Sequence, residues 1–138
     1  MHFKFIFSEE MTALIVGGWD GNNALKTTEI LQGRTCSSNS LPSLPNGISG
    51  QHSLILTSDV EEILLCGGYG NEQKCLELKD NQWEEHSNLK NSRAYASAVS
   101  MPGGIFLFGG SSSRTTWEWL PSGTNQWQSG NTNIPSVF

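Results

Sequence analysis

The sequence predicts an all-β fold made of three copies of one four-stranded unit, and three observations indicate this. An apolar run ends in a Gly–Gly pair at three places, at positions 17–18, 67–68 and 109–110. The segments around each pair are short and rich in β-branched and aromatic residues. No window sustains the apolar spacing of an amphipathic helix. A unit that recurs every 40–50 residues or so is typical of the four-stranded blades of a β-propeller.

Each unit is expected to contain its four strands in the same order. The first strand precedes a tight turn, the second is the apolar run that ends at the glycine pair, the third follows a polar loop, and the fourth is short. The expected strands are 3–7, 13–16, 27–31 and 35–41 in the first unit, 52–56, 63–66, 75–79 and 82–89 in the second, and 96–99, 105–108, 116–120 and 126–131 in the third. The units themselves are expected to span residues 1–48, 49–91 and 92–138, the last one truncated.

The glycine pairs and two tryptophans have predicted structural roles. Glycine reaches positive φ without strain and has no Cβ to meet adjacent backbone, so a pair can end a strand where neighbouring units crowd together. The structural glycines are Gly17, Gly18, Gly67, Gly68, Gly109 and Gly110. Trp83 and Trp127 are expected to begin the fourth strand of their units and to fill the space between units. Cys36 takes the equivalent place in the first unit, where we expect a less filled seam.

These features resemble the kelch repeat family. The shared pattern is the apolar run ending in Gly–Gly, the tryptophan some 15 residues later, the exit LPSLP at 41–45, and the entry at Arg93 followed by AYASAV. The resemblance extends from about Phe3 to Ile134 and implies kelch-type β-propeller blades of four antiparallel strands. The Trp19–Asp20 pair is also found in WD40 blades, but there it closes the third strand, whereas here it follows a glycine pair in one unit only.

Three blades make an incomplete propeller, because closed propellers typically have 4–8 blades. An open arc of three exposes an apolar sheet face at each end. We favour the interpretation that the chain is a fragment of a longer propeller. The alternative is that copies of the chain self-associate to complete a ring.

Charge and composition limit the expected partners. The chain carries 8 Lys and Arg against 13 Asp and Glu, a net charge of −5, and its basic residues are not clustered. Nucleic acid and anionic membrane surfaces are therefore not expected as partners. No apolar stretch approaches the length of a membrane helix, and the apolar start of the chain is shorter than the core of a signal peptide.

Catalytic signals are weak, so we expect a protein without enzymatic activity, metal or cofactor. The sequence lacks the GxSxG, HExxH, Walker A and GxGxxG motifs, and its three histidines, His2, His52 and His86, share no ligand spacing. Glutamates at 29, 77 and 118 recur once per unit, which indicates an architectural role. The main alternative is a fragment of a kelch-fold sugar-modifying enzyme of the oxidase or epimerase class. A further alternative is a gene product with no independent fold.

Cys66 and Cys75 flank the loop between the second and third strands of the second unit, at equal distances from its centre. They could face each other across adjacent strands and form a disulfide, which would indicate an oxidising, extracellular compartment. Secreted kelch-like proteins resemble this chain in such a CGG…C arrangement. The alternative is a pair of half-buried thiols in a cytoplasmic protein, and the sequence leaves the compartment open.

The resemblance to kelch propellers implies that loops carry the function. In that family the loops after the second strand and the loops between units gather on one face and bind protein partners. Exposed aromatic residues with polar neighbours suit such recognition. The candidate contact residues are Trp19, Asp20, Asn22, Tyr69, Asn71, Arg93 and Arg114. The alternative for Trp19 is that its ring folds back onto its own blade.

Overall fold

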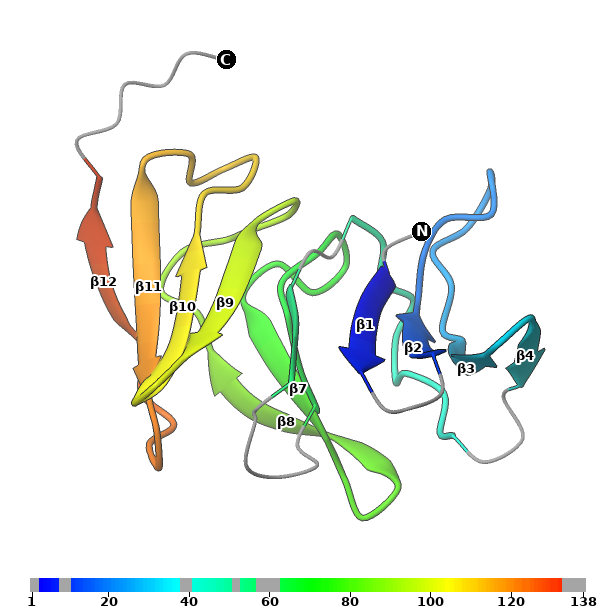
Figure 1. Cartoon of the computed structure of the whole chain (residues 1–138). Coiled ribbons are helices and arrows are strands. Elements are labelled where there is room, and N and C mark those ends of the chain that lie inside the picture. The colour runs from blue at the N-terminus through cyan, green and yellow to red at the C-terminus, as the bar shows by residue number, and fades with distance from the viewer. Residues whose placement is uncertain (1–2, 8–10, 38–40, 51–52, 57–62, 133–138) are drawn as a thin grey trace.

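The fold is all-β, as the sequence predicts (Figure 1). The computed structural model describes residues 3–7, 11–37, 41–50, 53–56 and 63–132, and within these ranges it contains twelve strands and no helix. It follows that no helix in the described part of the chain could cross a membrane. His2 and His52 lie outside the described residues.

The strands form three antiparallel sheets, each with its strands in chain order. The first sheet contains β1 (Phe3–Phe7), β2 (Met11–Val16), β3 (Thr28–Gln32) and β4 (Thr35–Ser37). The second contains β5 (Ser53–Leu56), β6 (Ile63–Cys66), β7 (Lys74–Lys79) and β8 (Gln82–Asn88). The third contains β9 (Ser97–Met101), β10 (Gly104–Phe108), β11 (Thr116–Pro121) and β12 (Gln128–Asn131).

Most predicted strands agree with the observed bounds to within one or two residues, and the fourth strands differ most. The fourth strand of the first unit, expected over 35–41, is described from Thr35 to Ser37, and positions 38–40 of that expectation lie outside the described residues. In the third unit β12 begins at Gln128, so Trp127 directly precedes the strand that it was expected to begin. A fourth strand is paired on one side only, and short edge strands are the usual way to limit unwanted pairing.

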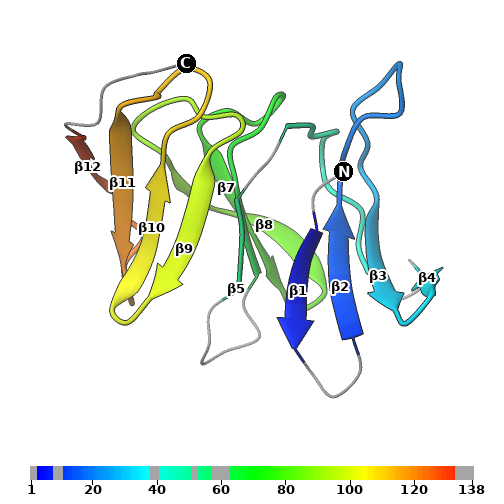
Figure 2. The ribbon, with the colours of Figure 1, turned by 45° about the horizontal axis from the view of Figure 1, so that its top comes forward.

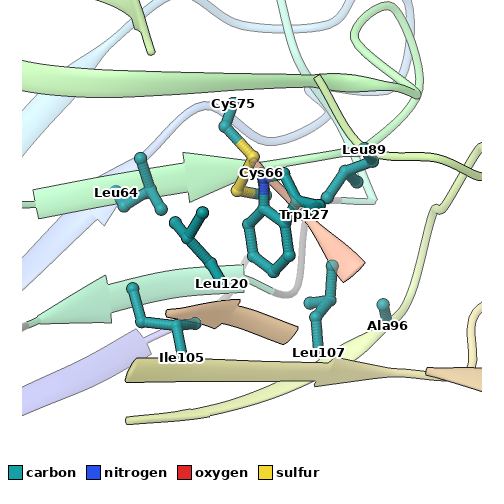
Figure 3. Close-up of a cluster of buried hydrophobic side chains, with 9 residues drawn as sticks. All are labelled: Leu64, Cys66, Cys75, Leu89, Ala96, Ile105, Leu107, Leu120 and Trp127. Carbon is teal, nitrogen blue, oxygen red and sulfur yellow. A yellow bond between two sulfur atoms is a disulfide. The ribbon is translucent and has the colours of Figure 1, made fainter. Parts of the chain in front are cut away.

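Two buried clusters hold the three sheets side by side. The first seam contains Leu14 and Val16 of the first sheet with Leu65 and Leu76 of the second. The second seam contains a larger set from the second and third sheets, drawn in Figure 3: Leu64, Cys66, Cys75, Leu89, Ala96, Ile105, Leu107, Leu120 and Trp127. Each seam removes apolar side chains of two sheets from water, which is the main term that stabilises the assembly of sheets.

Each sheet has a leading face, toward the preceding sheet in the chain, and a trailing face, toward the next sheet. Successive side chains of a strand point to opposite faces. In β6, Leu65 therefore packs on the first sheet, while Leu64 and Cys66 pack on the third. In β10, Ile105 and Leu107 belong to the leading face, because both pack on the second sheet.

The strand register corrects the prediction that one glutamate recurs at the same place in each unit. Glu29 pairs with Ile15, and Glu118 pairs with Leu107, so these two glutamates are equivalent. Glu77 instead pairs with Leu64, one residue out of phase, which places it on the opposite face of its sheet. The residue of the second unit that is equivalent to Glu118 is Leu76, paired with Leu65.

The glycine pairs end the second strand of each unit in a backbone conformation that favours glycine. All six of these residues have positive φ, from 60° at Gly17 to 121° at Gly18. At Gly110 an added Cβ would also lie 2.8 Å from the backbone oxygen of Ala94. The pair therefore allows both the sharp exit of the loop and the close approach of the segment that leads into β9.

Both tryptophans of the fourth strands lie in seams, each against the preceding sheet. Trp83 packs on the first seam, and its indole N–H lies 3.3 Å from Thr28 Oγ1 and 3.2 Å from the Pro42 carbonyl. Trp127 is buried in the second seam, and its indole N–H donates to Ser87 Oγ at 2.9 Å.

Cys36, which is exposed, does not line either seam. The described residues contain no seam on that side of the first sheet, so the expectation of a less filled seam at this position stays a prediction. Each tryptophan packs on the sheet before its own, and none of the sheets in the described residues precedes the first one. The seam beside the first sheet is filled by Trp83 from the second.

Candidate functional site

The three loops that follow the glycine pairs lie at the same end of the sheets, at the top of Figure 2. They are residues 17–27, 67–73 and 109–115. Backbone hydrogen bonds join them to the segments between sheets: Gly18 N donates to Ile48 O at 2.9 Å, Gly68 N to Arg93 O at 2.8 Å, and Ser111 N to Ala94 O at 2.8 Å. The loops and the intervening segments thus form one connected surface, which we call the loop face.

Two tyrosines form the centre of the loop face. Tyr69 and Ser49 exchange a pair of backbone hydrogen bonds, and Tyr95 N donates to Gly50 O at 2.8 Å. The two rings meet edge to face with their centroids 5.6 Å apart. Tyr95 also has a positive φ of 58°, which is uncommon for a residue other than glycine and often accompanies a functional constraint.

Three large aromatic side chains of the loop face are exposed. The exposed fractions are 59% for Trp19, 46% for Tyr69 and 52% for Tyr95. Trp19 is paired with Ala24 across its own loop, yet most of its surface faces solvent. Tyr95 was missed as a contact candidate by the sequence reasoning, although its place next to the entry at Arg93 was the available signal.

Asp20 holds the tip of the first loop. Its carboxylate accepts hydrogen bonds from the backbone N–H groups of Asn22 and Asn23, both at 2.7 Å. These bonds, that from Asn23 first, hold the pKa of Asp20 below its ordinary value of 3.8, because they stabilise the charged form. Asp20 and Asn22 are both exposed, so they remain available to a partner.

Arg93 was predicted to contact a partner, and the structure corrects this. Its side chain is fully buried and forms an ion pair with buried Glu118, Nε to Oε1 at 3.0 Å. Nη1 donates to the carbonyl oxygens of Gly109, Ser113 and Thr116 at 2.6, 3.3 and 3.2 Å, and Nη2 donates to Thr116 Oγ1 at 2.7 Å. A guanidinium can satisfy several acceptors from one position, and here it supports the third loop from below.

Glu118 completes this network from the other side. It accepts hydrogen bonds from the backbone N–H groups of Lys90 and Asn91, at 2.7 and 3.0 Å, in addition to the bond from Arg93. A buried charge pair is stable only when its remaining polar atoms are satisfied, and this pair meets that condition. The network therefore fixes the segment before β9 and the third loop relative to each other.

Of the remaining candidates, Asn71 is buried and Arg114 is exposed. Asn71 Nδ2 donates to Lys74 O at 3.0 Å, and its backbone N–H donates to Gly68 O at 3.0 Å. It shapes the second loop from inside, so the prediction that it contacts a partner is corrected. Arg114 is an exposed residue of the third loop.

The structure joins Cys66 and Cys75 by a disulfide, with their Cα atoms 4.1 Å apart. The two residues are directly paired across β6 and β7, and both are buried in the second seam. The bond closes the hairpin from which the second loop emerges.

The described residues contain no group of three or more His, Cys, Asp and Glu side chains that could hold a metal ion. Within the same residues, His86 Nδ1 lies 2.9 Å from Ser87 Oγ on β8. The loop face exposes aromatic and polar side chains on loops that backbone hydrogen bonds hold in place. Comparison of the chain with protein-family models and with curated proteins finds no match.

Proposed function

We propose that this chain is a non-catalytic protein-interaction module of the kelch-repeat type, with its sheets acting as propeller blades. Its binding site is the loop face. The observation that carries the proposal is the exposure of Trp19, Tyr69 and Tyr95 on loops joined by backbone hydrogen bonds. Aromatic side chains of this kind dominate the binding energy of protein interfaces and lose little conformational entropy on binding.

The polar residues around these aromatic side chains support recognition of a protein. Asp20 and Asn22 on the first loop and Arg114 on the third provide charged and hydrogen-bonding groups at the rim. Their charges are of both signs, which suits a polar rim around an apolar centre better than it suits a polyanion. Buried Arg93 and Glu118 keep the third loop in place, so less conformational entropy is lost when a partner binds.

The disulfide supports folding of this module in an oxidising compartment, because buried structural disulfides persist there and are rare in the cytosol. An extracellular partner is therefore the one to look for first. No arrangement of described side chains favours the sugar-modifying alternative.

The test is quantitative capture of partners by immobilised chain from extracellular fluid of the source tissue or culture. The double variant Trp19→Ala with Tyr69→Ala should no longer capture the specific partner. With the partner purified, the dissociation constant of the double variant should be at least about 30-fold higher than that of the wild type, which corresponds to about 2 kcal/mol, the loss expected for a hot-spot residue. Gln82→Ala on β8, an exposed residue away from the loops, is the matched control and should bind like the wild type.

The result that would overturn the proposal is a purified partner whose dissociation constant is unchanged by the double variant. Turnover of a sugar substrate by the wild-type chain would favour the enzymatic alternative instead. Both readouts need the variants to be folded, which far-ultraviolet circular dichroism checks.

A further inference from the structure

The trailing face of the third sheet carries mostly apolar side chains, and no other sheet of the described residues covers it. Val99, Met101 and Phe108 are 43%, 48% and 44% exposed. Glu118 is the only charged residue in β9 to β12, and it points to the opposite face, into the second seam. A sheet face directed at solvent normally carries polar or charged side chains, so an uncharged one marks an interaction site.

Aromatic rings cover the centre of this face. Phe106 and Trp117 stack with their centroids 5.5 Å apart, and Phe106 lies 6.1 Å from Phe108. Trp117 lies over Gly130 of β12 and Trp119 over Gly104 of β10, positions where a Cβ would collide with the indole. The missing side chains leave room for both indoles to lie close to the sheet, so the face is broad and suited to another sheet.

The equivalent faces of the other two sheets indicate which kind of surface packs against this face. Register places Phe106 and Phe108 at the positions of Leu64 and Cys66 in the second sheet, and of Leu14 and Val16 in the first. Each of those pairs is buried against the leading face of the next sheet. By this equivalence the occupant is the leading face of a further sheet of the same kind.

The leading face of the first sheet has the matching pattern. Ile15 of β2 is equivalent to Leu65 and Leu107, and Leu31, opposite residue 13, is equivalent to Leu78 and Leu120. Cys36 pairs with Leu31 as Trp83 pairs with Leu78, so Cys36 takes the place of the seam tryptophan. In the described residues no sheet covers this leading face.

We propose that the trailing face of the third sheet binds the leading face of the first sheet of a second copy of this chain. The contact is head to tail, between different surfaces of the two copies. Two such contacts close a dimer of six sheets, within the size range of closed propellers. The proposal rests on the kelch-type arrangement proposed above, but it does not depend on partner binding by the loop face.

Glu29 distinguishes this contact from the two seams within the chain. It occupies the position that Leu76 has in the first seam and that Glu118, paired with Arg93, has in the second. A carboxylate that becomes buried without such a partner opposes association. Replacing Glu29 by leucine should therefore strengthen the dimer.

Sedimentation equilibrium of the 138-residue chain over a concentration series measures the association directly. The wild type should form a dimer. Phe108→Arg on the trailing face should weaken it at least about 100-fold and Cys36→Arg on the leading face at least about 30-fold, because each buries an unpaired charge. Glu29→Leu should tighten it about tenfold. Gln82→Arg adds the same charge at an exposed site on β8 and should leave the constant unchanged.

A second measurement needs no substitution. Cys36 is exposed in one copy and is covered in the proposed dimer, so its alkylation by N-ethylmaleimide should slow at least about tenfold as the concentration passes the dimer midpoint. A wild type that is monomeric at all concentrations would overturn the proposal, and would do so without touching the loop-face proposal. A dimer that is unaffected by Phe108→Arg would also overturn the proposal. A dimer that is unaffected by Cys36→Arg would overturn it too, and would indicate that the trailing faces of the two copies pair with each other.

Discussion

The two seams have the same backbone geometry but use different chemistry at equivalent positions. In the first seam Ile48 and Leu76 belong to the buried apolar cluster. In the second seam the equivalent residues are Arg93 and Glu118, which form a buried ion pair. The equivalence follows from the hydrogen bonds of the glycine pairs, since Gly18 N donates to Ile48 O as Gly68 N donates to Arg93 O.

This difference shows that equivalent positions between two sheets can be filled either by an apolar pair or by a buried ion pair. The apolar pair is stabilised by removal from water and makes few demands on orientation. The ion pair costs desolvation, but its hydrogen bonds are directional and fix the third loop as well as the sheet. The second seam also contains the disulfide and the more deeply buried tryptophan. It is therefore the more tightly specified of the two.

The largest expected effect comes from breaking the ion pair. Glu118→Leu leaves Arg93 buried without its counter-charge and should lower the free energy of unfolding by about 3–5 kcal/mol, measured by urea denaturation. The double variant Arg93→Ile with Glu118→Leu copies the first seam. It should be at least about 1 kcal/mol more stable than Glu118→Leu alone, because no unpaired charge remains.

The double variant should still fall short of the wild type, since the carbonyl oxygens of Gly109, Ser113 and Thr116 lose their donor. A double variant no more stable than Glu118→Leu would show that the two seams cannot exchange their chemistry.

Loss of the disulfide should have the next largest effect. Cys66→Ala with Cys75→Ala should cost about 2–3 kcal/mol, as expected for a short closed loop, and the change is confined to the second seam. Mass spectrometry gives the supporting measurement. Alkylation of the unfolded chain without reductant should label Cys36 alone, and with reductant all three cysteines. Three labels without reductant would contradict the bond.

The two seam tryptophans allow a matched comparison. Trp127→Phe removes the hydrogen bond from a buried indole to Ser87 and should cost about 1–2 kcal/mol. Trp83→Phe removes the bonds to Thr28 and Pro42 at a partly exposed site, where water can replace them, and should cost about half as much. Equal losses of stability in the two variants, measured by thermal denaturation, would show that the difference in burial between the two indoles does not affect the free energy of their hydrogen bonds.

The smallest expected effect concerns the first loop, residues 17–27, whose tip is held by the exposed carboxylate of Asp20. The folded pKa of Asp20 is below 3.8, so its hydrogen bonds to Asn22 and Asn23 contribute fully above about pH 3.8 and are lost as the pH falls through the lower folded pKa. Amide chemical shifts of Asn22 and Asn23 should titrate there, and in Asp20→Asn they should not. A titration midpoint above 3.8 would contradict the assignment.

Much of the fold followed from local sequence. The glycine pairs, the apolar runs before them and the polar loops after them located most strands to within one or two residues. The face on which a residue of a third strand lies is harder to predict than the strand itself, because neighbouring residues point to opposite faces and an error of one residue reverses the face. The spacing of the sequence therefore groups Glu77 with Glu29 and Glu118, whereas its register places it on the other face of the sheet.

The exposure of the candidate contact residues agrees with the sequence less well than the strands do. Trp19, Tyr69 and Arg114 lie exposed on the loops, whereas Arg93 and Asn71 are buried and Tyr95 is exposed. A charged residue near a loop is more often exposed than buried, so sequence reasoning favoured Arg93 as a contact. Its partner Glu118 lies 25 positions away, and no local pattern connects the two.

By itself, the sequence determined the strand order, the turns and the repeat, because these depend on backbone conformation and on the alternation of neighbouring side chains. Only the tertiary structure decided which charges are buried, which tryptophan fills which seam, and which apolar face is left uncovered. Those outcomes depend on contacts between residues far apart in the chain, where packing and desolvation outweigh local preference.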